Sequence, residues 1–211
     1  MRVIVTRPRA QADELARRIA ALGHEPVLCP LVALEPLSDD PIDASGYDWV
    51  VVTSVNGAEE LARRLASPPA KVAAIGPGTA DALRARGIEP ALVARVSTQE
   101  GLLAELPRPA GRVLVAAAEG ARRFLADELD ADFVPLYRTV ELVPEEPPEG
   151  DLVVLASASA ARVWATLDVA LPAVSIGPQT TRAAREAGVE VVAEAEPHDL
   201  DGLVAALGRV I

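Results

Sequence analysis

The chain has 211 residues, of which half are hydrophobic and 24% are charged. This length is enough for one large or two small domains with ordinary apolar cores. The formal net charge of −11 argues against DNA or RNA as a partner, because nucleic-acid binding requires a basic face. A small anionic ligand stays open, since the local field of a site can oppose the total charge.

No targeting or membrane segment is expected. The N-terminal apolar run is interrupted at Arg7 and Pro8, too early for a signal peptide, and no apolar stretch reaches the length of a membrane span. The single cysteine, Cys29, excludes a disulfide within the chain. The sequence therefore predicts a soluble, cytoplasmic protein that does not bind a membrane.

Short runs of apolar residues alternate with amphipathic helical stretches along the chain. In chain order, strands are predicted at 3–5, 27–34, 49–52, 72–75, 113–115, 133–134, 152–155, 173–176 and 189–192. Helices are predicted between them, the clearest at 11–22, 56–65 and 79–86. Continuous apolar strands that alternate with helices indicate parallel sheets covered on both faces, which is an α/β fold.

The two halves of the chain resemble each other. The matching segments, in the same order in both halves, are 2–5 with 112–115, 30–31 with 135–136, 52–54 with 155–157, 71–80 with 172–181, and 84–89 with 185–190. This pattern indicates a duplicated α/β unit, and a tandem division near 107–111 is the simplest one. Pro-rich breaks at 35–41 and 143–148 also allow a crossed arrangement, in which residues 1–36 join the C-terminal third. The residues alone do not choose between the two.

The motif Ile-Gly-Pro-X-Thr occurs twice, each time between a predicted strand and a predicted helix. The first turn of a helix has free N–H groups and a partial positive charge. Gly76 and Gly177 would let an anion approach the backbone closely, and Thr79 and Thr180 would add hydroxyl groups. These turns could cradle phosphate or carboxylate. The alternative is a tight turn that serves only the fold.

A second matched pair of strand-to-helix junctions carries small polar side chains. These are Thr53, Ser54 and Asn56 in the first half, and Ser157 and Ser159 in the second. At the carboxyl edge of a parallel sheet, such residues can bind a ligand. They can equally serve as helix N-caps and nothing more.

Three larger polar residues lie near the ends of strands. Arg7 ends the first strand, Arg122 lies in the equivalent part of the second half, and Tyr137 lies where the chain leaves one α/β segment. An arginine can pair with a carboxylate through its fork of donors, and a tyrosine hydroxyl can act as a weak acid. Solvated arginines and a packed aromatic ring are the alternatives.

Several familiar sites are missing from the sequence. His24 and His198 have no metal-ligand spacing, and no nucleophile elbow or Ser-His-Asp pattern occurs. Asp81 stands where the third glycine of a dinucleotide fingerprint would be, and the Walker lysine is missing. These absences argue against NAD and ATP sites.

Taken together and in order, the motifs resemble one family. Thr6-Arg7-Pro8, Thr53-Ser54 with Asn56-Gly57, both Ile-Gly-Pro-X-Thr turns and Tyr137-Arg138-Thr139 are similar to those of uroporphyrinogen-III synthases. The resemblance covers nearly the whole chain. It implies two flavodoxin-like, parallel-sheet lobes joined by a two-strand linker, with the substrate cleft between them. One lobe would hold residues 1–36 plus 145–211, and the other 38–142.

The resemblance also implies the reaction. The family cyclises hydroxymethylbilane, a linear tetrapyrrole with eight carboxylates, to uroporphyrinogen III, with loss of water and inversion of ring D. It needs no metal or organic cofactor, and a monomer is expected. Tyr137 would be the catalytic acid that helps the hydroxyl leave. The residues expected to bind the substrate are Arg7, Thr53, Ser54, Asn56, Gly76, Gly78, Thr79, Arg122, Ser157, Ser159, Gly177 and Thr180.

Two segments depart from the family pattern. Ala156 removes a hydroxyl at the second-half junction, so only Ser157 and Ser159 are carried over there. The segment before Glu119 lacks an arginine that is common in the family, although Arg122 matches.

Two other functions stay open from the residues. The first is a binding module without catalytic activity. The second is a sugar-phosphate enzyme, which phosphate esters would inhibit and polycarboxylated pyrroles would not.

Overall fold

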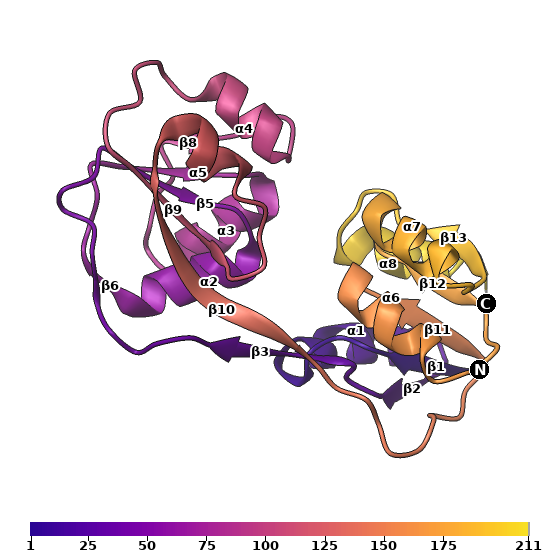
Figure 1. Cartoon of the computed structure of the whole chain (residues 1–211). Helices are drawn as coiled ribbons and strands as arrows, with labels where there is room; N and C mark the ends of the chain where they lie inside the picture. Colours follow the sequence, from indigo (N-terminus) through magenta and orange to yellow (C-terminus); the bar gives the residue numbers. More distant parts are fainter. Residues whose placement is uncertain (211) are drawn as a thin grey trace. The chain divides into compact units, whose positions relative to one another are not determined.

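A computed structural model describes residues 1–210, and the chain forms two compact units. Unit 1 consists of Met1–Leu34 and Val140–Ile211, and unit 2 consists of Glu35–Thr139. Each unit contains its own β-sheet with helices packed against it (Figure 1). Within the described residues, no helix is both long enough and apolar enough to cross a membrane.

Unit 1 is built on a five-stranded sheet in the order β13-β12-β11-β1-β2, in which every neighbouring pair is parallel. Its elements are β1 (Arg2–Val5), α1 (Arg9–Ala21), β2 (Glu25–Leu28), β11 (Leu152–Leu155), α6 (Ala158–Ala165), β12 (Ala173–Ser175), α7 (Pro178–Glu186), β13 (Val191–Glu194) and α8 (Leu200–Leu207).

Both faces of this sheet are covered. Val3 and Val5 pack on the side of α1 and α8, whereas Ile4 packs on the side of α6 and α7. This alternation explains why the buried positions of β1 and β11 are apolar on both faces of the sheet. Leu15 and Ile19 lie four residues apart on α1 and are fully buried, so each stabilises the unit by about 2 kcal/mol.

Unit 2 is built on a second sheet in the order β3-β10-β9-β5-β7-β8, in which the pairs from β10 to β8 are parallel. The strand β3 begins in unit 1 and β10 ends there, so both cross the division between the units. A two-stranded sheet, β4 with β6, is added to it. The elements are β3 (Val32–Pro36), β4 (Ile42–Asp43), β5 (Trp49–Val52), α2 (Val55–Arg64), β6 (Leu65–Ser67), β7 (Lys71–Ala74), α3 (Pro77–Ala85), β8 (Leu92–Val93), α4 (Gln99–Glu105), β9 (Val113–Ala118), α5 (Phe124–Leu129) and β10 (Asp132–Glu141).

The two sheets have the same spatial order once the repeated segments are matched. The order β2-β1-β11-β12-β13 corresponds to β10-β9-β5-β7-β8. Each set of five matched strands therefore takes two strands from one half of the sequence and three from the other, and β3 is an additional strand of the second sheet. The direct pairing of β1 with β11, at Val3 opposite Leu152, shows this in unit 1.

The α/β fold with parallel sheets is confirmed, and most predicted elements lie within two residues of the observed ones. The predicted strand at 27–34 is wrong in its continuity, because β2 ends at Leu28 and β3 begins at Val32. Pro30 lies in the gap, where it has no N–H to continue the ladder. The predicted strand at 133–134 is only part of β10, which extends from Asp132 to Glu141.

Candidate active site

The junction between β5 and α2 is organised by Ser54. Its backbone is extended, and its Oγ accepts a hydrogen bond from the Gly57 N–H at 3.0 Å, so it is the N-cap of α2. Serine favours this position because its short side chain reaches back to an unpaired N–H of the first turn. Thr53 and Asn56 flank Ser54 and are half-buried. The junction therefore exposes polar groups at the carboxyl end of β5.

Tyr137 reaches the same junction from β10. The register between β10 and β9 shifts between Pro135 and Tyr137, so an extra residue is inserted at Leu136. Leu136 and Tyr137 are both buried, and the extra residue changes which face of the strand the following side chains take. The Tyr137 hydroxyl lies 3.0 Å from Ser54 Oγ. The shift in register therefore directs the ring toward the N-terminus of α2.

Only one of the two repeats contains this contact. Ser157 caps α6 as Ser54 caps α2, since its Oγ accepts from the Ala160 N–H at 3.1 Å. The residue that matches Tyr137 in the other repeat is Val32. The serine caps are therefore common to both units, and the serine–tyrosine pair belongs to unit 2 alone.

The helices α3 and α7 begin differently from their neighbours. Their N-cap residues are Gly76 and Gly177, which provide no side-chain cap, and a proline follows each. Within residues 1–210, the N–H groups of Gly78 and Thr79 have no protein acceptor. Unpaired amides at a helix N-terminus favour an anion. Thr79 itself is buried.

Gly76 and Gly177 both lie against side chains of the protein, and the space is much tighter at Gly76. Both have extended backbones, which any residue can adopt. A Cβ at Gly76 would lie 2.2 Å from Ser97 Oγ, and one at Gly177 would lie 3.2 Å from the His198 ring. Side chains of the protein therefore occupy the space beside these glycines in which a ligand was predicted to approach the backbone. Gly78 is less crowded, because a Cβ there would lie 3.8 Å from its nearest neighbour, Val55 Cγ2.

The two candidate arginines have different surroundings. Arg7 is half-buried, and burial lowers the pKa of its guanidinium. Its Nη2 donates to Gln11 Oε1 at 3.4 Å, and no carboxylate within the described residues pairs with it. Arg7 can therefore bind a carboxylate without giving up an existing ion pair.

Arg122 is already engaged. Its two terminal nitrogens donate to the two oxygens of Glu100 at 2.7 and 3.1 Å. This bidentate pair lowers the pKa of Glu100 to about 2. Gln99 Nε2 also donates to the Arg122 carbonyl oxygen at 3.1 Å. A substrate carboxylate would have to compete with Glu100, a residue on α4 that no motif in the sequence points to.

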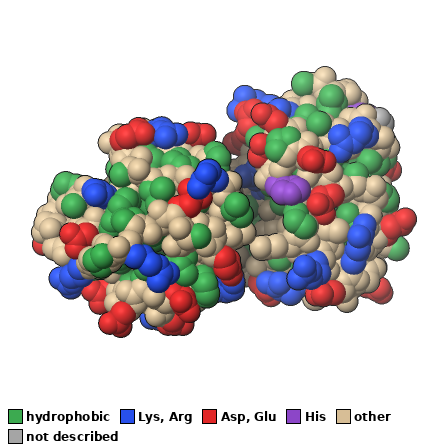
Figure 2. Space-filling view, turned by 90° about the horizontal axis from the view of Figure 1, so that it is seen from above, with side chains coloured by type: hydrophobic (Ala, Val, Ile, Leu, Met, Phe, Trp, Pro, Cys, Tyr) green, Lys and Arg blue, Asp and Glu red, His purple; other side chains and the backbone are tan. Residues whose placement is uncertain are grey.

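The remaining predicted residues lie in unit 1. Ser159 Oγ accepts from Arg162 Nη2 at 3.2 Å, and Thr180 is buried in the first turn of α7. In unit 1 the predicted residues lie at the carboxyl ends of β1, β11 and β12. In unit 2 they lie at the carboxyl ends of β5, β7 and β9, and on β10. Figure 2 shows acidic and basic side chains interspersed over the face in view.

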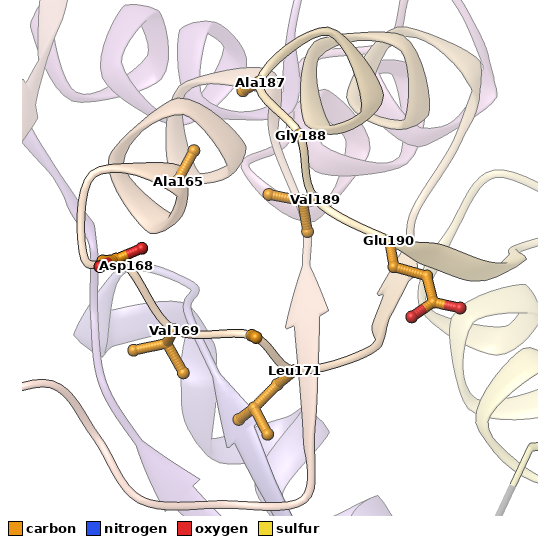
Figure 3. Close-up of a pocket in the computed structure, with 9 residues that line it drawn as sticks. Ala165, Asp168, Val169, Leu171, Ala187, Gly188, Val189 and Glu190 are labelled. Atoms are coloured by element: carbon orange, nitrogen blue, oxygen red, sulfur yellow. The ribbon is translucent and has the colours of Figure 1, made fainter.

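A hollow in unit 1 lies away from these residues. It has a volume of about 280 Å³ and is formed where α6 and α7 end, between Ala165 and Asp168 on one side and Val189 and Glu190 on the other (Figure 3). None of the predicted site residues lines it. Within residues 1–210, no group of three or more His, Cys, Asp or Glu side chains is arranged to hold a metal ion.

These features define an α/β protein with a helix N-terminus whose first amides have no acceptor within residues 1–210, and with a buried tyrosine at the carboxyl edge of a sheet. A family model described as uroporphyrinogen-III synthase HemD matches residues 13–205. The chain therefore belongs to the uroporphyrinogen-III synthase family.

Individual relatives agree with this assignment. The chain is 25% identical to the uroporphyrinogen-III synthase of Synechococcus elongatus, over 97% of this chain and 93% of that protein. It is 28% identical to a putative uroporphyrinogen-III synthase of Methanocaldococcus jannaschii, over 67% of this chain and 63% of that protein. A crystal structure of a mutant uroporphyrinogen III synthase from Thermus thermophilus has the same fold, with a TM-score of 0.66, 21% identity, and coverage of 99% of this chain and 98% of that one.

Proposed function

We propose that this protein cyclises hydroxymethylbilane to uroporphyrinogen III, with loss of water and inversion of ring D, as a monomer in the cytoplasm and without a nucleic-acid partner. The observation that carries the proposal is the Tyr137 hydroxyl, 3.0 Å from Ser54 Oγ at the carboxyl edge of the sheet, in a chain matched to the family over residues 13–205. Residues 1–36 plus 145–211 and residues 38–142 would be the two lobes of the enzyme.

The helix N-termini suit a substrate with many carboxylates. The amides of Gly78 and Thr79 lack protein acceptors, and Arg7 lacks a carboxylate partner within residues 1–210. Such groups attract carboxylates locally although the whole chain is acidic. They occur in both units, which is consistent with a ligand that carries several anionic groups.

Tyr137 is proposed to assist the departure of the hydroxyl group. The phenol would give its proton to the substrate hydroxyl as the C–O bond breaks, and the bonding electrons would leave with oxygen as water. The cation that remains is delocalised over the pyrrole, and the substituted α-carbon of ring D then attacks it. The bond from that carbon to its original methylene bridge breaks, the methylene re-attaches at the unsubstituted α-carbon of ring D, and the proton lost there returns to the phenolate. The enzyme would also hold the linear tetrapyrrole in the conformation that favours attack by the substituted α-carbon.

A coupled assay tests the activity. Hydroxymethylbilane is generated in place, the protein is added, and the oxidised porphyrin isomers are separated. Isomer III in excess over isomer I is expected. Isomer I alone, at the spontaneous rate, would overturn the proposal.

A single substitution tests the role of the tyrosine. Tyr137→Phe is expected to lower kcat about a hundredfold with KM little changed, because it removes the acid and keeps the ring. Tyr47→Phe is the matched control, because the Tyr47 hydroxyl donates to Asp132 instead. A kcat for Tyr137→Phe close to that of the control would refute the acid role.

A further inference from the structure

We propose that Ser54 is a positioning residue that orients the hydroxyl of Tyr137 toward the substrate. This inference rests on the proposed function, since it assigns Ser54 a part in the same reaction. The contact that carries it is the 3.0 Å distance between Ser54 Oγ and Tyr137 Oη. Ser54 acts through Tyr137 and is not itself the acid.

The Ser54 hydroxyl is held in place by the helix that it caps. Its oxygen accepts the Gly57 N–H at 3.0 Å, so rotation about the side-chain bond would break the cap. Gly57 also allows α2 to lie close to the neighbouring strands. A Cβ there would lie 3.0 Å from Ser54 Oγ and 3.7 Å from the Ala116 carbonyl oxygen. The phenol of Tyr137 therefore meets a partner fixed to a helix N-terminus.

The hydroxyl groups of Ser54 and Tyr137 carry one proton each, and this decides which of the two donates the hydrogen bond during the reaction. Ser54 Oγ has one proton and uses one lone pair for Gly57. When Ser54 donates this proton to Tyr137 Oη, the phenol proton is free to point at the leaving hydroxyl. After transfer, the Ser54 hydroxyl still donates to the phenolate oxygen and stabilises its charge. No proton is gained or lost by Ser54 in this sequence.

Comparison with the other repeat distinguishes the proposed positioning role of Ser54 from its role as a helix cap. Ser157 makes the same cap in unit 1, where the residue that matches Tyr137 is Val32. A cap alone therefore does not need a tyrosine partner. The polar contact of Ser54 is additional to the part that both units share.

The test is a double-mutant cycle between Ser54→Ala and Tyr137→Phe in the isomer assay. Ser54→Ala is expected to lower kcat about tenfold with little change in KM. In the Tyr137→Phe background, the same substitution is expected to cause no further loss, because Ser54 acts through the missing hydroxyl. Ser54→Thr keeps a hydroxyl and is expected to recover most of the rate.

Thr98→Ala is the matched control for the lost cap. Thr98 Oγ1 accepts the Gly101 N–H at the same 3.0 Å and so caps α4, and it is not among the residues predicted to bind the substrate. It is expected to lower stability as Ser54→Ala does and to leave kcat unchanged. Equal kcat values for Ser54→Ala and the wild type would overturn the inference. So would losses from Ser54→Ala and Tyr137→Phe that simply multiply.

The failure of this inference is distinguishable from the failure of the proposed function. If the unmodified protein forms no isomer III, the proposed function is wrong. If it forms isomer III and the cycle shows no coupling, only the role of Ser54 is wrong.

Discussion

Replacing Gly76 by alanine tests whether this motif glycine serves packing or ligand approach. Its extended backbone, with φ of −179°, imposes no strain on alanine. The added methyl would lie 2.2 Å from Ser97 Oγ and 2.9 Å from Ser97 Cβ. Rotating the serine side chain relieves the first contact and leaves the second, so the loop before α4 has to shift.

The magnitude follows from comparison with Gly177. Overpacking of this kind costs about 2 kcal/mol, and the stiffer unfolded chain returns about 0.5 kcal/mol. A methyl at Gly177 meets the His198 ring at 3.2 Å, which a shift of a few tenths of an ångström relieves. We therefore expect Gly76→Ala to destabilise by about 1.5 kcal/mol and Gly177→Ala to be nearly neutral.

The two tryptophans allow each unit to be followed separately. Trp49 is buried in unit 2 and Trp164 in unit 1. In a Trp164→Phe background, denaturation followed by fluorescence reports the unfolding of the unit that contains Gly76. A Trp49→Phe background does the same for Gly177. This design gives a free energy of unfolding for each unit even where the whole chain does not unfold in one step.

A second substitution decides the cause. Ser97→Gly removes both crowding atoms and is expected to offset most of the Gly76→Ala loss, which would appear as a coupling energy between the two sites. If substrate also approaches Gly76, the double variant would be stable but would have a raised KM. Equal stability of Gly76→Ala and Gly177→Ala, or no coupling with Ser97, would refute the packing argument.

Two further predictions concern unit 2. The carboxyl of Glu100 is expected to titrate near pH 2 by NMR, because Arg122 holds its pKa at about 2, and Arg122→Gln should return it toward 4.5. Because the folded-state pKa of Glu100 is lowered, the pair's contribution to the free energy of unfolding is fully present above the unfolded-state pKa and is lost as the pH falls through the folded-state pKa. A titration midpoint near 4.5 for Glu100 in the wild type would contradict this prediction. Gly57→Ala is expected to lower kcat more than Thr98→Ala, because its methyl would press on Ser54 Oγ at 3.0 Å; equal kcat values in the isomer assay would count against this.

The sequence predicted the fold well because the central strands of both sheets are buried. β11 and the last three residues of β1 are apolar at every position, and burial on both faces leaves few alternatives to a parallel sheet. The short pair β4 and β6 was missed, because Ile42–Asp43 and Leu65–Ser67 are too brief to show a periodicity. The register shift in β10 was missed as well, since it depends on how the chain meets β9 around Leu136.

The candidate site was predictable in part. The residue types and their positions after strands identified Ser54 and Ser157 as N-caps or ligands, and the structure shows the caps. What the sequence could not show is which residues from distant segments meet them. Glu100 reaches Arg122 across 22 residues, and Tyr137 reaches Ser54 across 83. Such pairings are decided by sheet order and register, which local patterns do not contain.

Comparison of the two internal repeats helps to separate residues that stabilise the fold from residues that take part in a reaction. A difference between the repeats at one position is not sufficient by itself. Unit 1 contains a chain of hydroxyls, Ser175 to Thr181, that continues to the Glu194 carboxylate, where unit 2 has Ala74, Ala80 and Val93.

These hydrogen bonds connect α7 to β12 and β13 and occur in unit 1 only. Ser175 is fully buried, so its hydroxyl is not accessible to a ligand. Tyr137 satisfies a stricter condition. It is absent from the other repeat, and its hydroxyl meets the capped N-terminus of α2. The next strand-to-helix junction, whose Gly78 and Thr79 amides have no acceptor within residues 1–210, is adjacent because β5 pairs directly with β7. This combination, present in one repeat only and next to helix N-termini that both repeats contain, is why the catalytic role is proposed for Tyr137.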